Sequence, residues 1–295
     1  IAQSLARFCN PTCSSRGNCQ QQKYIVRAGN DTILLGSQTF EALQETPFDA
    51  WFTKSVDTAH FSVKMARKLK KDLKDITLQL FMGTWCGDSR REVPRLYAML
   101  DYIHFPKDKI NLVFVDNEDS TYKESPGMEE RGKYIFRIPT LIISKAGIEM
   151  GRVIEYPQKN WIEDMRSIVK KEPYTPHYAA GFAWMKLMDT TDADDLLLDS
   201  TRLADKLKPM VSTRSELNTV GIIYELNGDT KKAFASYAIN RILFPKDARV
   251  LNNLARMYAA NGNTQYATEY YHQALIMEPD LEDAKQALKR IEDQK

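Results

Sequence analysis

One cysteine, Cys86, lies at the boundary between a segment typical of a strand and a segment typical of a helix. The run 76–81 is mostly apolar and rich in β-branched residues, which predicts a buried strand. Apolar residues then recur at helical spacing, so we expect a helix that begins near Asp88 and buries the face formed by Val93, Leu96, Tyr97, Leu100 and Ile103. Unpaired N–H groups and the positive end of the helix dipole would lie beside the sulfur and favour a thiolate. The expected chemistry is nucleophilic attack by this sulfur.

Charged residues flank this cysteine in the sequence, and they differ in sign. Arg90 and Arg91 add positive charge near the sulfur, whereas Asp88, two residues away, opposes them. The sequence leaves the electrostatic balance at Cys86 open.

A second motif follows further along the chain. Residues 136–147 read Phe-Arg-Ile-Pro-Thr-Leu-Ile-Ile-Ser-Lys-Ala-Gly, which is typical of a proline that enters an apolar strand ending in a turn. Proline cannot donate a hydrogen bond to a sheet ladder, so Pro139 at the start of this strand favours a cis peptide bond.

Together these motifs resemble the thioredoxin superfamily. The family pattern is Trp-Cys-x-x-Cys with a helix-kinking proline eight residues after the first cysteine, and Pro94 stands eight residues after Cys86. The family's cis-proline precedes a threonine, as Pro139 precedes Thr140 here. The resemblance covers residues 60–172 and implies an α/β thioredoxin-like fold, a central mixed sheet flanked by helices. The Gly-Thr-Trp-Cys-Gly-Asp-Ser turn is similar to that of a bacterial, Bacteroidetes-type subfamily.

Two departures from the family pattern bear on mechanism. The second cysteine is replaced by Ser89, and the buried acid of the family is replaced by Leu80. A serine cannot expel a substrate from a mixed disulfide, so the resemblance implies monothiol chemistry completed by an external thiol reductant. In this hypothesis Cys86 is the nucleophile and Ser89 hydrogen-bonds the thiolate or the leaving sulfur. The implied substrate-docking residues are Trp85, Ile138 and Pro139.

An alternative function remains open at this point. The fold can be kept as a binding module without turnover, in which case the protein is a non-catalytic interaction scaffold. The sequence leaves both functions open, and the one we carry forward is a monothiol thiol-disulfide oxidoreductase.

Three further cysteines, Cys9, Cys13 and Cys19, cluster in a Ser/Asn/Gln-rich leader. Three cysteines can form one disulfide and leave one free thiol, and each of the three is a possible resolving thiol for Cys86. Their spacing, with no histidine nearby, does not favour zinc. A disulfide-capable leader suits an oxidising compartment, and the opening Ile-Ala-Gln resembles the tail of a secretory signal. We expect a soluble protein that is periplasmic or otherwise exported.

The last third of the chain contains an internal repeat. Five residues recur 34 positions later, a period that resembles the tetratricopeptide repeat: Tyr224, Gly228, Ala233, Tyr237 and Pro245 correspond to Tyr258, Gly262, Ala267, Tyr271 and Pro279. The resemblance implies an all-α domain of paired helices, with residues 281–291 as a capping helix. Segments 178–188 and 192–207 are expected to supply connecting helices.

Helical repeats mostly serve as interaction surfaces, so we expect a protein or peptide partner here and at the Cys86 face. Four polar residues on the presumed inner helices are candidates for binding an acidic peptide in a groove: Asn218, Arg249, Asn252 and Arg256.

The 295 residues are 43% apolar and carry a net charge of +2, which is ordinary for a globular chain and does not indicate nucleic-acid binding. No apolar run is long enough for a membrane span. No phosphate-binding loop, dinucleotide fingerprint or metal-ligand pattern occurs, so we expect neither cofactor nor metal. The predicted division is a flexible leader (1–22), a thioredoxin-like domain with an N-terminal hairpin that adds to its sheet (23–172), connecting helices (173–211) and the repeats (212–295).

Overall fold

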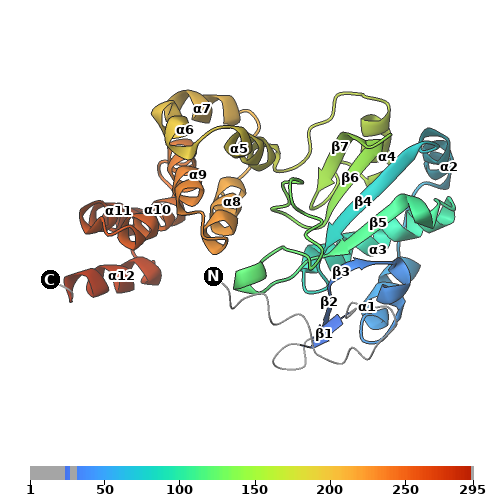
Figure 1. Ribbon diagram of the computed structural model, residues 1–295, viewed down its shortest axis with the longest axis horizontal. Coiled ribbons are helices and arrows are strands. Elements are labelled where there is room, and N and C mark those ends of the chain that lie inside the picture. Colours follow the sequence, from blue (N-terminus) through green and yellow to red (C-terminus); the bar gives the residue numbers. More distant parts are fainter. Residues whose placement is uncertain (1–23, 27–31, 294–295) are drawn as a thin grey trace, which may run out of the picture.

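The computed structural model describes residues 24–26 and 32–293. It consists of an α/β region with a mixed five-stranded sheet, followed by a region made only of helices (Figure 1). This coarse division into a mixed α/β part and an all-helical part agrees with the sequence-based prediction.

The main sheet is built around β4, the strand that precedes Cys86. The strand order is β3-β5-β4-β6-β7, and β4 pairs parallel with β5 and antiparallel with β6. The remaining two pairs, β3 with β5 and β6 with β7, are antiparallel. The strands are β3 (Gly36–Gln38), β4 (Ile76–Met82), β5 (Ile110–Phe114), β6 (Thr140–Lys145) and β7 (Ile148–Ile154).

The N-terminal hairpin does not join this sheet. β1 (Tyr24–Val26) and β2 (Thr32–Leu34) pair antiparallel in a two-stranded sheet of their own, and it is the next strand, β3, that pairs with β5 at the sheet edge. The expected hairpin is therefore present, but its expected place in the main sheet is corrected. Gly36, with φ of +71°, begins β3, two residues after the end of β2.

The two faces of the main sheet carry different cores. Alternating residues of β4 such as Leu78 and Leu80 point to one face, where they pack with helices on a large apolar cluster. That face is covered by α1 (Asp49–Asp57), α2 (Val63–Asp72), α3 (Gly87–Tyr102) and α4 (Trp161–Val169). Phe81 points to the other face and joins a small cluster that includes Ile138 and contacts Cys86. The thiol thus lies above the smaller core.

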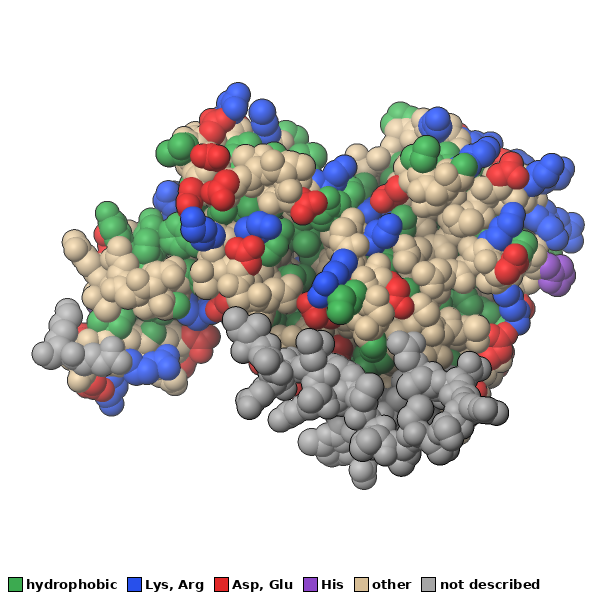
Figure 2. Space-filling view, viewed as in Figure 1, with side chains coloured by type: hydrophobic (Ala, Val, Ile, Leu, Met, Phe, Trp, Pro, Cys, Tyr) green, Lys and Arg blue, Asp and Glu red, His purple; other side chains and the backbone are tan. Residues whose placement is uncertain are grey.

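The basic stretch of the sequence forms α2, an amphipathic surface helix. Ala66 and Leu69 are buried, whereas the lysines between them and beyond are exposed. Lys and Arg side chains gather over this helix at the right edge of the molecule in Figure 2. The pattern is the ordinary one of charge opposite an apolar stripe.

The helical region follows the predicted segments closely, with one exception. Residues 192–207 form two helices rather than one, because the helix is interrupted at Asp199. The Asp199 N–H donates to the Leu196 carbonyl, and the next helix begins at the following residue. The helices are α5 (Ala179–Thr190), α6 (Ala193–Leu198), α7 (Ser200–Leu207), α8 (Ser215–Leu226), α9 (Thr230–Leu243), α10 (Ala248–Ala260), α11 (Thr264–Met277) and α12 (Glu282–Glu292). No helix in the described part of the chain is both long and apolar enough to cross a lipid bilayer.

The 34-residue period is visible as repeated local geometry. Gly228 and Gly262 follow α8 and α10 with φ of +77° and +76°, values that favour glycine. The next residues, Asp229 and Asn263, cap α9 and α11 by accepting a hydrogen bond from a backbone N–H three residues on. Because the same turn recurs at the same spacing, α8–α9 and α10–α11 are two copies of one helix pair.

The two regions share an apolar interface. Phe136 and Ile154 from the sheet region are buried in one cluster with residues of α5, α8 and α9, among them Trp184. Phe136 packs so closely on α5 that a Cβ at Gly181 would stand 2.6 Å from its ring. The segment before β6 is therefore held by the helical region.

Candidate functional site

Cys86 is the N-cap residue of α3, which begins at Gly87, one residue before the start near Asp88 that the sequence predicts. Its backbone is extended, with φ −85° and ψ 124°, and its carbonyl accepts the first hydrogen bond of the helix from the Arg90 N–H. The side chain is partly exposed and makes contact with the small core cluster on its inner side. This position combines access for a reactant with the positive end of the α3 dipole.

The sulfur contacts an acceptor rather than a donor. Cys86 Sγ lies 3.5 Å from the carbonyl oxygen of Ile138, and its side chain makes no capping bond to the N–H groups of α3. The thiol therefore donates to this carbonyl, and a thiolate would gain nothing from the same oxygen. Stabilisation of a thiolate at Cys86 would have to come from the α3 dipole and from nearby positive charge.

Ser89 lies beneath the thiol turn and is fully buried. Its hydroxyl oxygen accepts a hydrogen bond from the Gly83 N–H at 3.4 Å, which ties the first turn of α3 to the end of β4. Leu80, on β4, is buried hydrocarbon, so this strand position offers no titratable group below the site.

Trp85 is held in place over the smaller core. Its Nε1 donates to the Val115 carbonyl at 2.9 Å, and its ring lies 6.0 Å from that of Tyr122. Gly83 permits this position, because a Cβ there would stand 2.5 Å from Trp85 Nε1. Trp85 therefore lines one side of the thiol site.

The segment of Pro139 lines the opposite side. The Ile138–Pro139 peptide bond is cis, and the Thr140 hydroxyl donates to the Arg137 carbonyl at 2.6 Å. The carbonyl of Pro139 accepts from the Glu155 N–H at 2.7 Å, which links the segment to the end of β7. The structure thus brings four predicted site residues together around Cys86, namely Ser89, Trp85, Ile138 and Pro139.

The arginines that follow Cys86 are engaged with other groups. Arg91 forms a salt bridge with Asp88 at 2.7 Å, so these two charges largely offset each other. Arg90 donates from Nε to the Thr84 carbonyl and stacks over Trp51, 5.6 Å from its centroid. Asp88 is therefore offset by Arg91, whereas Arg90 bonds a neutral carbonyl and keeps its positive charge.

Lys123 is a site residue that sequence reasoning missed. It follows Tyr122 in the connection between β5 and β6 and is buried, with 6% of its surface exposed. Its ammonium donates to the Phe136 carbonyl at 2.5 Å. Burial, followed by the charge of Arg137, lowers the pKa of Lys123 to about 7, while the charges of Cys86 and Glu155 act to raise it. No pattern in the sequence marks this loop lysine, since its burial arises only from tertiary packing.

Arg137 connects the thiol site to the helical region. Its guanidinium pairs with Glu155 at 3.1 Å and donates to the side chain of Ser215 at 2.9 Å, at the first residue of α8. It also stacks on Tyr178, 4.6 Å from the ring centroid. The residue next to Ile138 is therefore bound directly to the first repeat helix.

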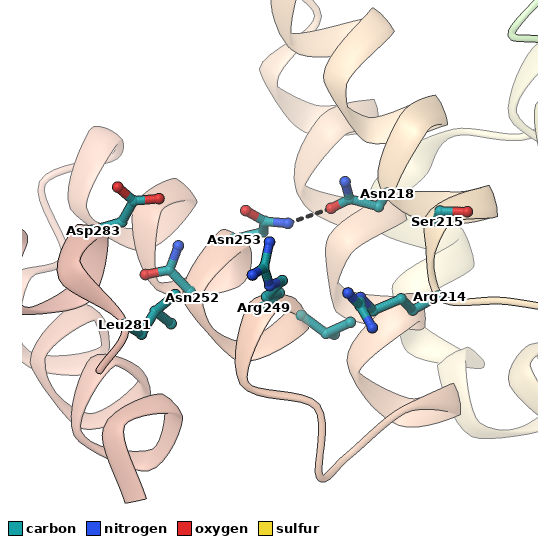
Figure 3. Close-up of a pocket in the computed structure, with 9 residues that line it drawn as sticks. Arg214, Ser215, Asn218, Arg249, Asn252, Asn253, Leu281 and Asp283 are labelled. Atoms are coloured by element: carbon teal, nitrogen blue, oxygen red, sulfur yellow. Dashed lines mark hydrogen bonds between the residues drawn. The ribbon is translucent and has the colours of Figure 1, made fainter. Parts of the chain in front are cut away.

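A second polar site lies on the helical region, between α8, α10 and α12. The cavity there has a volume of about 300 Å³. Its lining side chains come from all three helices and from the turns that precede α8 and α12 (Figure 3). The Asn253 amide donates to Asn218 across the gap between α10 and α8. Asn252 is 8% exposed and its carbonyl oxygen has no hydrogen-bond partner among the described residues. The lining residues are Arg214, Ser215, Asn218, Arg249, Val250, Asn252, Asn253, Leu281 and Asp283.

Three of the four predicted groove residues line this cavity, which are Asn218, Arg249 and Asn252. Arg256 does not share it. Its guanidinium instead forms two hydrogen bonds with Glu225 on α8 and lies 3.3 Å from the Tyr237 hydroxyl.

The predicted resolving thiols, Cys9, Cys13 and Cys19, lie outside the described residues. Within the parts of the chain that the structure does describe, no group of three or more His, Cys, Asp or Glu side chains is placed to hold a metal ion.

In comparisons with known proteins, no family model and no curated protein sequence matches this chain. The family assignment therefore stays a prediction, and it depends on the motif residues around Cys86 and Pro139 and on the 34-residue repeat.

Proposed function

We propose that this protein is an exported thioredoxin-like thiol-disulfide protein of the monothiol type, with a tetratricopeptide-type helical domain that binds a partner. The observation that carries the proposal is the position of Cys86, partly exposed at the N-terminus of α3 and directly facing the Ile138 carbonyl beside Pro139. The buried hydroxyl of Ser89 then occupies the position of the second family cysteine. Export is proposed from Cys9, Cys13 and Cys19, because cysteines that can form a disulfide suit an oxidising compartment.

The reaction would proceed in two exchange steps. The Cys86 thiolate attacks one sulfur of a substrate disulfide, a Cys86–substrate disulfide forms, and the other substrate sulfur leaves as a thiolate. An external thiol then attacks the substrate sulfur of this mixed disulfide, which releases the Cys86 thiolate and leaves the substrate joined to the external thiol. With a sulfenic acid as substrate, the first step forms the same mixed disulfide and releases water.

The test is capture of partners as mixed disulfides from an oxidised extract. We expect wild-type protein to form reducible complexes and Cys86→Ser to form none, because serine cannot form a disulfide. The matched control replaces the three leader cysteines by serine and keeps Cys86, and it should still capture partners. Cys86 should also react faster with alkylating reagents than free cysteine at neutral pH. Ordinary reactivity and no captured partner would contradict the proposal and favour the interaction scaffold.

The interaction scaffold is supported by a separate observation, the cavity on the helical region. Its buried Asn252 carbonyl oxygen lacks a partner among the described residues, and an unpaired buried polar atom gains about 1 kcal/mol or more when a ligand supplies a hydrogen bond. Arg214 and Arg249 line the cavity and are paired with Asp247 at 3.0 Å and Glu278 at 3.7 Å, so an acidic peptide would bind by competing with these two carboxylates for the arginines.

A fluorescent peptide rich in Asp and Glu serves as the probe for this second function. We expect binding that weakens with salt and falls about tenfold in Asn252→Leu, since that change removes the amide and fills its place. Arg256→Gln is the control, because Arg256 lies outside the cavity and pairs with Glu225. Equal binding by wild type and Asn252→Leu would contradict the proposed peptide site.

A further inference from the structure

Arg137 belongs to the segment that faces the thiol and directly precedes Ile138, whose carbonyl accepts from Cys86 Sγ. Its guanidinium forms hydrogen bonds in two directions. Nη1 donates to Glu155 at 3.1 Å, at the end of β7. Nη2 donates to the hydroxyl of Ser215 at 2.9 Å and to its carbonyl at 3.2 Å, at the first residue of α8. One side chain therefore joins the segment that faces the thiol to the helical region.

Glu155 holds the same segment at a second point. Its side chain accepts from Arg137, and its backbone N–H donates to the Pro139 carbonyl at 2.7 Å. The carbonyl of Arg137 in turn accepts from the Thr140 hydroxyl at 2.6 Å. Ile138 thus lies between two residues that are both fixed by hydrogen bonds, and its carbonyl is held in front of the sulfur.

The start of α8, to which Arg137 is bound, is itself firmly held. Glu216 is fully buried, and its carboxylate accepts from the Ser212 N–H at 2.6 Å and from the Gly181 N–H at 3.3 Å. The Ser215 hydroxyl also lies 2.7 Å from the hydroxyl of Thr213. These bonds tie the start of α8 to α5 and to the turn before it. The position of Ser215 is therefore set by the helical region.

The arrangement depends on a guanidinium. The Arg137 and Glu155 side chains are 18% and 9% exposed, and the Tyr178 ring covers the guanidinium at 4.6 Å from its centroid. The planar fork of an arginine presents donors at fixed angles, so it can bind Glu155 and Ser215 together. A lysine carries all its donors on one nitrogen and would not keep both contacts in the same geometry.

The position of this segment matters most for disulfide exchange. The attacking sulfur has to approach the substrate disulfide along its S–S bond, and a substrate docked beside Ile138 and Pro139 takes its orientation from them. A displacement of about 1 Å at a docking element can cost a large factor in rate. Alkylation by a small reagent needs only an accessible thiolate, so it depends much less on this segment.

We propose that Arg137 is a positioning residue of the thiol site, which holds Ile138 and Pro139 in place against Cys86 through its bonds to α8. The inference rests on the proposed function of the same site. It adds that the helical region takes part in the thiol chemistry through Ser215, besides binding a partner.

The test is a single round of disulfide exchange by the full chain with its three leader cysteines replaced by serine. The probe is a short peptide whose one cysteine is joined in a disulfide to thionitrobenzoate. The Cys86 thiolate attacks the peptide sulfur, a Cys86–peptide disulfide forms, and the coloured thionitrobenzoate leaves as a thiolate. The rate is read at saturating peptide, so that weaker docking alone does not lower it. Alkylation of Cys86 by iodoacetamide is measured in parallel.

We expect Arg137→Lys to lower the saturated exchange rate about tenfold, because the reacting sulfurs lose their alignment. Ser215→Ala should lower it about threefold, since the Ser215 carbonyl still accepts from the guanidinium. Alkylation should change by less than about twofold in both variants. When both substitutions are combined, the loss should equal that of Arg137→Lys alone, because Ser215 acts through Arg137.

Two matched controls should keep the exchange rate of the wild type. Arg166 pairs with Asp72 at 2.8 Å, and its side chain is also 18% exposed, but it joins α4 to α2. Arg166→Lys therefore disturbs an ion pair of the same exposure away from the thiol. Ser200 is the first residue of α7, as Ser215 is of α8, so Ser200→Ala repeats the change at another helix start.

Three results would overturn the inference. The first is an equal exchange rate for wild type, Arg137→Lys and Ser215→Ala. The second is a parallel loss of exchange and alkylation, which would mean that only packing was disturbed. The third is additive losses in the combined variant, which would mean that Ser215 acts by another route.

Thermal unfolding shows whether each variant is folded. If Arg137→Lys fails to fold, Ser215→Ala decides, and an exchange rate equal to that of wild type contradicts the inference. A wild-type protein that releases no thionitrobenzoate would contradict the proposed function and this inference with it. Wild-type exchange that neither substitution alters would contradict the inference alone.

Discussion

The Cys86 site and the cavity of the helical region both contain polar groups, but backbone groups contribute much of the first site and side chains line the second. Around Cys86 the contacts come from backbone carbonyls and N–H groups and from buried side chains such as Ser89 and Lys123. In the helical cavity they come from side chains, some buried, such as Asn252, and some at the surface, such as Arg214, which pairs with Asp247 at 3.0 Å. A site made of backbone is fixed by the fold, whereas a site made of surface side chains can change residue by residue. The first arrangement suits chemistry at one atom, and the second suits recognition.

The largest effect on activity is expected from Ser89→Cys, which replaces one oxygen atom by sulfur and turns the monothiol site into a dithiol site. Ser89→Cys places a second sulfur one helical turn after Cys86, and residues three apart on a helix are neighbours. Because Ser89 is buried and the Cys86 side chain is partly exposed, the new thiol would attack a mixed disulfide from the protein side. We expect a disulfide between residues 86 and 89 after oxidation, and turnover with dithiothreitol and insulin that the wild type lacks.

Peptide mapping after oxidation checks the expected bond. Ser89→Ala is the control, since it removes the hydroxyl without adding a thiol. Two reduced thiols at these positions under oxidising conditions would show that the first turn of α3 does not have the geometry of a disulfide-forming site.

A change of intermediate size tests how strongly the two regions depend on each other. Gly181→Ala forces a Cβ to within 2.6 Å of the Phe136 ring, and we expect overpacking to lower the free energy of unfolding by about 1–3 kcal/mol. Gly87→Ala, in the first turn of α3, meets no atom within 4 Å and should be neutral or stabilising by about 1 kcal/mol or less.

Urea unfolding of both variants gives the comparison. Gly181→Ala should also slow alkylation of Cys86, because Phe136 belongs to the segment that faces the thiol. Equal free energies of unfolding for the two alanine variants would mean that the interface between the regions accommodates the added methyl group without loss of stability.

A smaller effect is expected in the pH dependence of stability. Lys123 has its pKa lowered to about 7 in the folded protein, from 10.5, so between these values the unfolded chain binds a proton that the native protein does not. The free energy of unfolding therefore gains a contribution that rises with pH, by about 1 kcal/mol per pH unit. Below pH 7 both states are protonated at Lys123 and this contribution is constant. Lys123→Met should remove the rise, as measured by urea midpoints from about pH 7 to about pH 9.

Parallel pH profiles for wild type and Lys123→Met would contradict the assignment of this slope to Lys123. Lys109→Met serves as the control, because the Lys109 ammonium also donates to a backbone carbonyl, that of Lys74 at 2.8 Å, but Lys109 is only partly buried. This variant should keep the slope of the wild type.

The smallest effect separates two arginines of α10. Arg256 forms a two-pronged pair with Glu225, so Arg256→Gln should lower the free energy of unfolding by up to about 1 kcal/mol. Arg249 lies 3.7 Å from Glu278, with both side chains well exposed, so Arg249→Gln should change stability by less than about 0.5 kcal/mol. Binding of the acidic peptide should show the opposite order. If Arg256→Gln weakened peptide binding more than Arg249→Gln does, the peptide site would not be the cavity that Arg249 lines.

Much of the positioning of the thiol is present in the local sequence. A strand followed by a helix start defines the place of Cys86, a proline before an apolar strand defines the facing segment, and a fixed period defines the helix pairs. Each depends on neighbours within a few residues or on an exact repeat. Such features can be predicted from hydrophobic periodicity and from repeat spacing in the sequence.

The electrostatics of the site could not be predicted in the same way. Lys123 reaches the Phe136 carbonyl from a loop without periodicity, and Arg137 binds Ser215, which is 78 residues away. Such contacts are set by the assembled fold and leave no local pattern.

The central claim is that Cys86 is a nucleophile that forms mixed disulfides, and incubation with oxidised glutathione followed by peptide mass spectrometry tests it most directly. We predict a glutathionyl adduct on Cys86 that reducing agents remove, that Cys86→Ser lacks, and that persists when the three leader cysteines are replaced. An unmodified Cys86 under conditions in which the leader cysteines are modified would contradict the account.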